Sequence, residues 1–223
     1  METLISIRDL NKFFMTPLSQ LHVLKGINAE LCRGEMTAIM GPSGVGKSTL
    51  LHILGALDSP TSGKVFYESK DIFGMGGDEL SDFRNKTIGF VFQFHHLLPE
   101  FNAVENTMMP ALISGVSYKE AYKKAQAILE EVGLSDRLLH KPGELSGGEQ
   151  QRVAVARALI LEPKVVFADE PTGNLDTQTG EGIFRLLGSL NDKKGITFFI
   201  VTHNENLASR CTRTIKMLDG KIV

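Results

Sequence analysis

The sequence predicts an α/β fold with a largely parallel sheet and an inserted block of helices. Short apolar runs with a strand-like composition alternate with helical stretches over most of the chain, a pattern typical of parallel sheets. The apolar run at residues 36–40 ends at a glycine-rich turn that leads into an apolar helical stretch. Residues 103–139 instead contain helical patterns with no strand between them, which predicts the helical block.

The individual elements follow from these periodicities in chain order. We expect strands within residues 1–31, with a turn at residues 16–20. Further strands are predicted at residues 36–40, 65–67, 88–92, 164–168, 196–202 and 213–218. Helices are predicted at residues 47–56, 104–113, 119–132, 149–161 and 180–190.

Length and composition exclude several classes of protein. The 223 residues carry 24 Lys+Arg and 26 Asp+Glu, so a formal net charge of −2 gives no basic surplus for binding nucleic acid. A hydrophobic share of 42% suits a folded core, and no apolar run approaches the ~18 residues of a membrane span. Residues 1–10 lack the pattern of a signal peptide. Cys32 and Cys211 are expected to be packing residues in a reducing cytosol.

A glycine-rich segment follows the predicted strand at residues 36–40. Its sequence, Gly41-Pro42-Ser43-Gly44-Val45-Gly46-Lys47-Ser48, matches the pattern G-x-x-x-x-G-K-[ST]. In such a loop, backbone N–H groups point at phosphate oxygens, and the positive N-terminus of the next helix faces the same anion. Lys47 would reach the β- and γ-phosphates, and Ser48 would offer a hydroxyl to Mg²⁺. The strand–loop–helix context disfavours the alternative, a glycine-rich turn with a chance Lys and Ser.

Two carboxylates close the buried strand predicted before them. Asp169 and Glu170 follow the run Val165-Val166-Phe167-Ala168. Ligands of open α/β sheets bind at the carboxyl ends of the strands. Asp169 could hold Mg²⁺ through water there, and Glu170 could orient or deprotonate an attacking water. A solvated acidic pair is the alternative, and the phosphate loop upstream disfavours it.

A second glycine cluster, Leu145-Ser146-Gly147-Gly148-Glu149-Gln150, also opens a predicted helix. Alone it is a weak signal, because Ser is a common N-cap and Gly-Gly a common loop. The string LSGGEQ beside a phosphate loop and an acidic strand end is the signature of ATP-binding cassette (ABC) ATPases. The chain resembles this family along its whole length.

The resemblance implies an ABC-type nucleotide-binding domain of the P-loop NTPase class. Such a domain has a RecA-like core, an N-terminal antiparallel β subdomain and an inserted α-helical subdomain. Residues 1–223 are expected to form one such domain. Residues 1–92 and 163–223 would form the core with the β subdomain, and residues 93–162 the helical signature subdomain.

The resemblance also assigns roles to single residues. Gln93 resembles the Q-loop glutamine, Asp176 the D-loop aspartate and His203 the switch histidine that contacts the γ-phosphate. Phe14 falls where the family stacks an aromatic ring on adenine, with Phe13 as the alternative.

These roles define the predicted site. The catalytic residues are expected to be Glu170, His203, Lys47 and Gln93. The predicted Mg²⁺ ligands are Ser48, Gln93 and Asp169. The expected ATP-binding residues are Phe14, Gly41, Pro42, Ser43, Gly44, Val45, Gly46, Lys47, Ser48, Thr49, Gln93, Asp169, Glu170 and His203. Because the signature of this family closes over ATP held by a second subunit, the resemblance implies a head-to-tail homodimer.

One segment indicates which ABC ATPases are most similar. Residues 89–101, followed by Ala103-Val104-Glu105-Asn106, resemble the ATPases of bacterial lipoprotein-releasing systems. Residues 169–176 are shared with a wider group that includes macrolide-efflux, mechanotransmitting and cell-division ATPases, which remain alternatives. The region Gln93–Phe101 would then dock separate membrane subunits, which places the chain peripherally on the cytoplasmic side of the bacterial inner membrane.

Two other classes fit less well. A P-loop GTPase would carry N-K-x-D, but Asn85-Lys86-Thr87-Ile88 lacks the Asp, and neither a GTPase nor a small-molecule kinase uses LSGGEQ. Among soluble ABC proteins, the chromosome type needs a long coiled-coil insertion and the translation type needs two cassettes. This chain has neither pattern.

Overall fold

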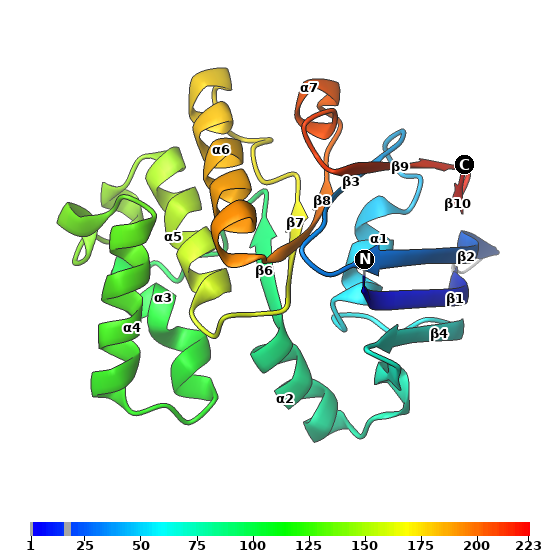
Figure 1. The fold of residues 1–223 in the computed structure, drawn as a ribbon, viewed down its shortest axis with the longest axis horizontal. Coiled ribbons are helices and arrows are strands. Elements are labelled where there is room, and N and C mark those ends of the chain that lie inside the picture. Colours follow the sequence, from blue (N-terminus) through cyan, green and yellow to red (C-terminus); the bar gives the residue numbers. More distant parts are fainter. Residues whose placement is uncertain (1, 16–18) are drawn as a thin grey trace. The chain divides into compact units, whose positions relative to one another are not determined.

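The computed structural model describes residues 2–15 and 19–223, which fall into two compact units (Figure 1). One unit consists of Met1–Arg84 and Thr197–Val223, and the other is Asn85–Ile196. The predicted phosphate loop belongs to the first unit and the predicted signature to the second.

An antiparallel sheet forms the N-terminal part of the first unit. Its strands are ordered β2-β1-β4-β5, and β1 pairs antiparallel with both β2 and β4. Leu4, Ile5, Ile7 and Leu10 of β1 are all buried. The strands are β1 (Thr3–Met15), β2 (Gln20–Cys32), β4 (Ser62–Tyr67) and β5 (Lys70–Asp71).

The first unit also contains parallel strands around β3. This strand pairs in parallel with β8 on one side and β9 on the other, and β10 pairs antiparallel with β9. These strands are β3 (Met36–Met40), β8 (Thr197–Val201), β9 (Arg213–Leu218) and β10 (Lys221–Ile222). The helices of this unit are α1 (Lys47–Leu54), the 3₁₀ turn Ile72–Gly74 and α7 (Glu205–Ala208).

The second unit is mostly helical. Its two strands, β6 (Ile88–Phe92) and β7 (Val165–Asp169), pair in parallel, and α5 packs against β6. The helices are α3 (Ala103–Ile113), α4 (Tyr118–Glu131), α5 (Gly147–Leu159) and α6 (Thr177–Lys194), with 3₁₀ turns at Ser135–Arg137 and Pro142–Glu144. Helix α2 (Gly77–Thr87) contains the boundary between the units.

Polar side chains start each of the four helices α3 to α6. Asn102, Ser117, Ser146 and Asp176 are N-caps whose side-chain oxygens accept a hydrogen bond from a backbone N–H of the first turn. In α3 and α5 a glutamate three residues on completes a capping box. Two of these caps, Ser146 and Asp176, are predicted site residues, so the start of each helix also places part of the candidate site.

The predicted α/β fold is confirmed. The strands at residues 36–40, 88–92 and 213–218 have the predicted bounds, whereas β1 and β2 are long strands of 13 residues each. Helix α2 was not predicted, because Leu80 and Phe83 are its only large apolar residues and two such residues make too short a stripe to recognise. Residues 16–18 of the predicted turn lie outside the described residues, and the division into subdomains stays a prediction.

None of the helices in the described part of the chain combines the length and the hydropathy that a membrane span requires.

Replacing Gly89 with Ala should destabilise the second unit. A Cβ at Gly89 would lie 2.5 Å from the carbonyl oxygen of Ala158, where β6 meets α5. Strand and helix would have to separate, at a cost of about 1–3 kcal/mol. Urea unfolding without nucleotide measures this loss.

The matched control is Gly188→Ala in α6, because nothing lies within 4 Å of a Cβ built there. The higher helix propensity of Ala should leave the free energy of unfolding unchanged or raise it by up to about 1 kcal/mol. Equal losses in both variants would contradict the close packing of β6 against α5.

Candidate functional site

The phosphate loop joins β3 to α1, and close packing explains its first glycine. A Cβ at Gly41 would lie 2.3 Å from the carbonyl oxygen of Met217. Gly46, the N-cap of α1, has a φ of 103°, a left-handed conformation that favours glycine, and no side chain caps the helix. The first N–H groups of a helix have no partner within it. The N-terminus of α1 therefore presents backbone donors and positive potential to an anion.

Lys47 lies against the loop that precedes it. Its Nζ donates to the carbonyl oxygens of Gly41 (2.8 Å) and Pro42 (2.9 Å). An ammonium group has three N–H donors, so these two bonds leave one for a further acceptor. The loop thus holds a positive charge at its centre, beside the uncapped start of α1.

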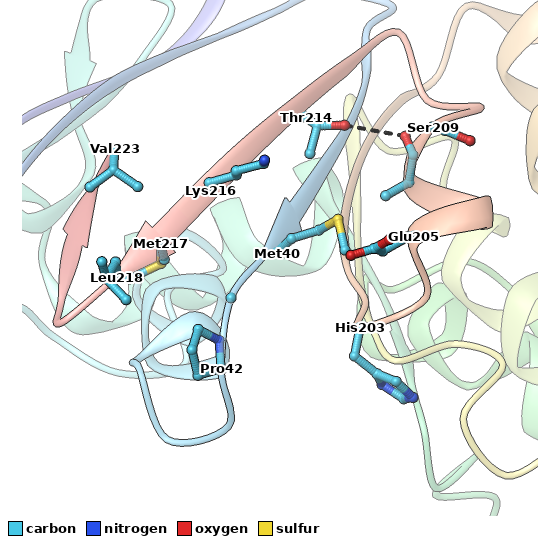
Figure 2. Close-up of a pocket in the computed structure, with 12 residues that line it drawn as sticks. Met40, Pro42, His203, Glu205, Ser209, Thr214, Lys216, Met217, Leu218 and Val223 are labelled. Atoms are coloured by element: carbon cyan, nitrogen blue, oxygen red, sulfur yellow. Dashed lines mark hydrogen bonds between the residues drawn. The ribbon is translucent and has the colours of Figure 1, made fainter.

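His203 lines the same pocket as the start of the phosphate loop. This pocket of about 690 Å³ is lined by Gly41, Pro42, His203 and residues of α7 and β9 (Figure 2). His203 follows β8 by two residues, after Thr202, whose Oγ1 accepts a hydrogen bond from Asn204 N (3.1 Å). The structure therefore brings two predicted parts of the site, the loop and His203, together within the first unit.

The two candidate adenine-stacking residues have different surroundings. The ring of Phe13 stacks on His22, with centroids 3.8 Å apart and an interplanar angle of 18°. Phe14 is 41% exposed, and the Nζ of Lys12 lies 4.9 Å from its ring centroid. His22 thus stacks on one face of Phe13, whereas Phe14 has only the Lys12 ammonium near its ring among the contacts described and remains exposed to solvent.

In the second unit, Gln93 is hydrogen-bonded to the segment after β7. Its Nε2 donates to Asn174 Oδ1 (2.8 Å), and Asn174 Nδ2 donates back to the carbonyl oxygen of Gln93 (3.2 Å). Gly173, the residue before Asn174, also packs closely against Gln93, because a Cβ at Gly173 would lie 2.9 Å from Gln93 Nε2. Asn174 was not predicted as a site residue, because its contact with Gln93 joins two segments that are far apart in the sequence.

Asp169 and Glu170 occupy the end of β7 as predicted. Asp169 is the last residue of the strand and pairs in register with Phe92. Glu170 has a φ of 46°, a left-handed conformation that is uncommon for a residue other than glycine. Such strain costs about 1–3 kcal/mol and is common at functional sites.

Gln151 is a buried polar residue that the sequence analysis missed. It is 1% exposed, and its Nε2 donates to the carbonyl oxygens of Pro171 (2.8 Å) and Phe92 (3.3 Å). Gln151 therefore ties helix α5 to the last residue of β6 and to the segment that follows β7. A glutamine at an apolar position of a predicted helix was the available signal.

The signature begins α5 with a tightly hydrogen-bonded cap. Glu149 Oε2 accepts from Ser146 N (2.8 Å) and from Ser146 Oγ (2.7 Å), while Arg137 Nε donates to Glu149 Oε1 (2.8 Å). The hydrogen bond from Arg137, followed by those from Ser146, lowers the pKa of Glu149 from its ordinary value of 4.5 to about 2.

The signature glycines pack against the segment that contains Asp176. A Cβ at Gly148 would lie 2.4 Å from Thr179 Cγ2, and one at Gly147 would lie 3.3 Å from Leu175 Cδ2. Asp176 caps α6 by accepting from Thr179 N (3.0 Å), and its hydrogen bonds with Thr179 lower the pKa of this carboxyl. The predicted signature and D-loop are therefore in contact within one unit.

The three predicted Mg²⁺ ligands offer the donor chemistry that this ion prefers. Ser48 supplies an exposed hydroxyl at the start of α1, and Asp169 a carboxylate at the end of β7. Because Gln93 donates through Nε2 to Asn174, its amide oxygen faces away from that contact. Hydroxyl, carboxylate and amide oxygens fit a hard cation that is bound together with phosphate oxygens.

The comparisons with known proteins agree in one family. The profile of the ABC transporter family matches residues 24–173. The lipoprotein-releasing system ATP-binding protein LolD of Syntrophus aciditrophicus is 55% identical over 220 residues, 99% of this chain and 99% of that protein. The protein of the same name from Geobacter metallireducens is 55% identical over 223 residues, 100% of this chain and 99% of that protein.

Solved structures lead to the same family. The ATP-binding cassette MJ0796, a dimer in a post-hydrolysis state bound to ADP and Pi, has a TM-score of 0.90 at 40% identity and covers 98% of this chain and 96% of its own. The cassette cbiO1 of Clostridium perfringens, part of the ABC transporter complex cbiONQ, has a TM-score of 0.88 at 30% identity, with 100% and 88% covered.

Glu149 should make stability depend on pH in the acid range. Because its folded pKa is lower than its unfolded value of 4.5, its contribution is present above pH 4.5 and is lost as pH falls toward 2. Solvent screening of this surface group limits the contribution to about 1 kcal/mol. Urea midpoints at pH 3, 4, 5 and 7 should therefore fall more steeply for the wild type than for Glu149→Gln, and parallel curves would contradict the assignment.

Proposed function

Since the chain belongs to the ABC transporter family, as an ATP-hydrolysing subunit, we propose that its ATPase cycle drives the release of lipoproteins from the inner membrane of a bacterium. The observation that carries this proposal is the full-length identity of 55% to lipoprotein-releasing LolD proteins. In this role two copies work with separate membrane subunits, which recognise the cargo.

ATP binding would begin at the loop between β3 and α1. Residues 41–49 bind the phosphates through backbone N–H groups and Lys47, whose position inside the loop supports this role. Phe14 stacks on adenine. The exposure of its ring supports Phe14 over Phe13, whose face is covered by His22.

Hydrolysis would use residues at the start of α1 and at or just after the ends of β6, β7 and β8. Ser48, Gln93 and Asp169 hold Mg²⁺, which when bound neutralises negative charge on the phosphate oxygens. Glu170 aligns and deprotonates the attacking water, and the unusual backbone of this residue at the end of β7 supports a specialised role. Lys47 and His203 stabilise the negative charge that develops on the transferring phosphoryl group.

A second copy would complete each ATP site. The signature, Leu145 to Gln150, covers the ATP that its partner holds, with Ser146 and Gly148 contacting the γ-phosphate and Asp176 bridging the two sites. The dimeric state of the solved cassette MJ0796 supports this arrangement. Because Ser146 Oγ donates to Glu149, it has to rotate away from that carboxylate to donate to phosphate.

The membrane subunits would bind at residues 93–101, here called the docking segment. Two large apolar side chains of this segment are exposed, Phe94 at 65% and Leu98 at 41%. Exposed apolar groups rimmed by polar residues are typical of protein interfaces. This docking places the chain peripherally on the cytoplasmic side of the inner membrane.

Glu170→Gln should lower the rate of ATP hydrolysis by roughly 10²–10⁴-fold, because an amide cannot accept the proton of the attacking water. ATP binding should persist, so an ATP-bound dimer should accumulate in size-exclusion chromatography with MgATP. Glu162→Gln is the control, since Glu162 is an exposed glutamate with a similar φ of 54°. Wild-type turnover in Glu170→Gln would remove this residue from the catalytic role.

Replacing both Phe94 and Leu98 with Ser should abolish co-purification with the membrane subunits and leave nucleotide binding unchanged. Leu57→Ser, at a residue of comparable exposure (47%) in the first unit, should leave the complex intact. The identity of the co-purified proteins separates lipoprotein release from macrolide efflux or cell division. Retention of the complex by the double variant would contradict docking at this segment.

A further inference from the structure

The docking segment is fixed to the helices of its own unit by side chains that bind its backbone. Asn106 of α3, only 1% exposed, accepts from Leu98 N (2.8 Å) and donates to the carbonyl oxygens of Leu98 (3.0 Å) and Phe101 (2.9 Å). These bonds hold the C-terminal half of the segment to α3.

Arg157 of α5 holds the other half. Its NH1 donates to the carbonyl oxygen of His96 and its NH2 to that of His95, both at 2.7 Å. A guanidinium presents its N–H donors in a rigid planar fork, so one side chain fixes the direction of two successive carbonyl groups. Neither acceptor is a carboxylate, and burial lowers the pKa of Arg157. The partly buried guanidinium of Arg157 is thus hydrogen-bonded to the backbone of one loop.

The clamped backbone is strained. His96 has a φ of 48°, a left-handed conformation that is uncommon for residues other than glycine. The ring of Phe92 contacts that of His96 edge-on, with centroids 5.4 Å apart. Arg157 and Phe92 therefore both contact this turn, and loss of the guanidinium would remove the two hydrogen bonds that it donates to the carbonyl oxygens of His95 and His96.

The two clamped carbonyl groups lie between the exposed side chains of Phe94 and Leu98 in the sequence. The orientation of the backbone at His95 and His96 consequently sets how these apolar groups are presented. The clamp belongs to α5, the helix that starts at the signature residue Ser146. At 1.5 Å per residue, about 17 Å of rigid helix separates Arg157 from Ser146.

We propose that Arg157 is a positioning residue that fastens the docking segment to the signature helix, so that movement of one moves the other. The proposal rests on the proposed function, because it takes residues 93–101 as the place where membrane subunits bind. Load applied at Phe94 and Leu98 then reaches Ser146 through Arg157 and α5. The same connection runs in reverse when ATP binds the signature, since coupling between two sites is reciprocal.

Amide hydrogen exchange of the isolated full chain tests the clamp directly. In Arg157→Met, which keeps the length of the side chain but has no donors, the amides of residues 94–98 should exchange about tenfold faster. Arg157→Lys should give an intermediate rate, because an ammonium group lacks the planar fork. It also serves as the informative variant if Arg157→Met folds poorly.

Arg152→Met is the matched control on the same helix. Arg152 NH1 donates to the carbonyl oxygen of Val132 (2.7 Å), away from the docking segment. Its loss should leave exchange at residues 94–98 unchanged. Unchanged exchange in Arg157→Met, or an equal increase in both variants throughout the chain, would overturn the proposal and leave Arg157 with a merely structural role.

The second readout compares two ATPase activities. One is that of the complex with the membrane subunits that co-purify with the wild type, and the other is that of the isolated chain; their ratio is measured for each variant. Arg157→Met should lower this ratio by at least about fivefold, and Arg152→Met should leave it unchanged. An unchanged ratio in Arg157→Met overturns the inference. Retention of the complex by the Phe94 and Leu98 double variant instead overturns docking, so the two failures are distinguishable.

Discussion

The register of parallel strands is the constraint on which the candidate site depends. In the first unit, Ile39 of β3 pairs with Val201 of β8, and both strands are buried. Gly41 and His203 each follow this pair by two residues, so both leave the sheet at the same edge. A slip of one residue would turn the apolar side chains of either strand to its opposite face. Core packing therefore also fixes how the phosphate loop and His203 meet at one pocket.

The second unit applies the same constraint to a different pair. Phe92 pairs with Asp169 at the ends of β6 and β7, so the residues that follow them, Gln93 and Glu170, leave neighbouring strands at the same edge. Where such strands end, backbone carbonyl groups lose their ladder partners and need others, since unpaired buried carbonyl groups are costly. Gln151 supplies them, donating to Phe92 and to Pro171 from a fully buried position on α5. Helix α5 is thus hydrogen-bonded to the chain where it leaves each of the two strands.

Local patterns predicted those parts of the structure that a run of neighbouring residues specifies. The strand Met36–Met40 and the motif that ends in Lys47 are of this kind. Gln151 and Arg157 were missed, because their partners are backbone carbonyl groups, which every residue carries and no sequence pattern marks. Helix α2 was missed for a different reason, since its only large apolar residues are Leu80 and Phe83 and none of its residues is fully buried.

The two glycine-containing helix starts differ in how their first turn is satisfied. Helix α1 has Gly46 as its N-cap and no side-chain cap, so no capping side chain competes with an anion for its first N–H groups. Lys47, which donates to the carbonyl oxygens of Gly41 and Pro42, keeps one N–H donor for the same anion. Helix α5 is closed by Ser146 and Glu149, and a phosphate that binds there must displace a carboxylate with a pKa of about 2. We therefore expect phosphate to bind more weakly at the signature than at the loop. For a proposed dimer that closes on ATP and opens after hydrolysis, tight binding at the loop retains the nucleotide, while weak binding at the signature keeps closure reversible.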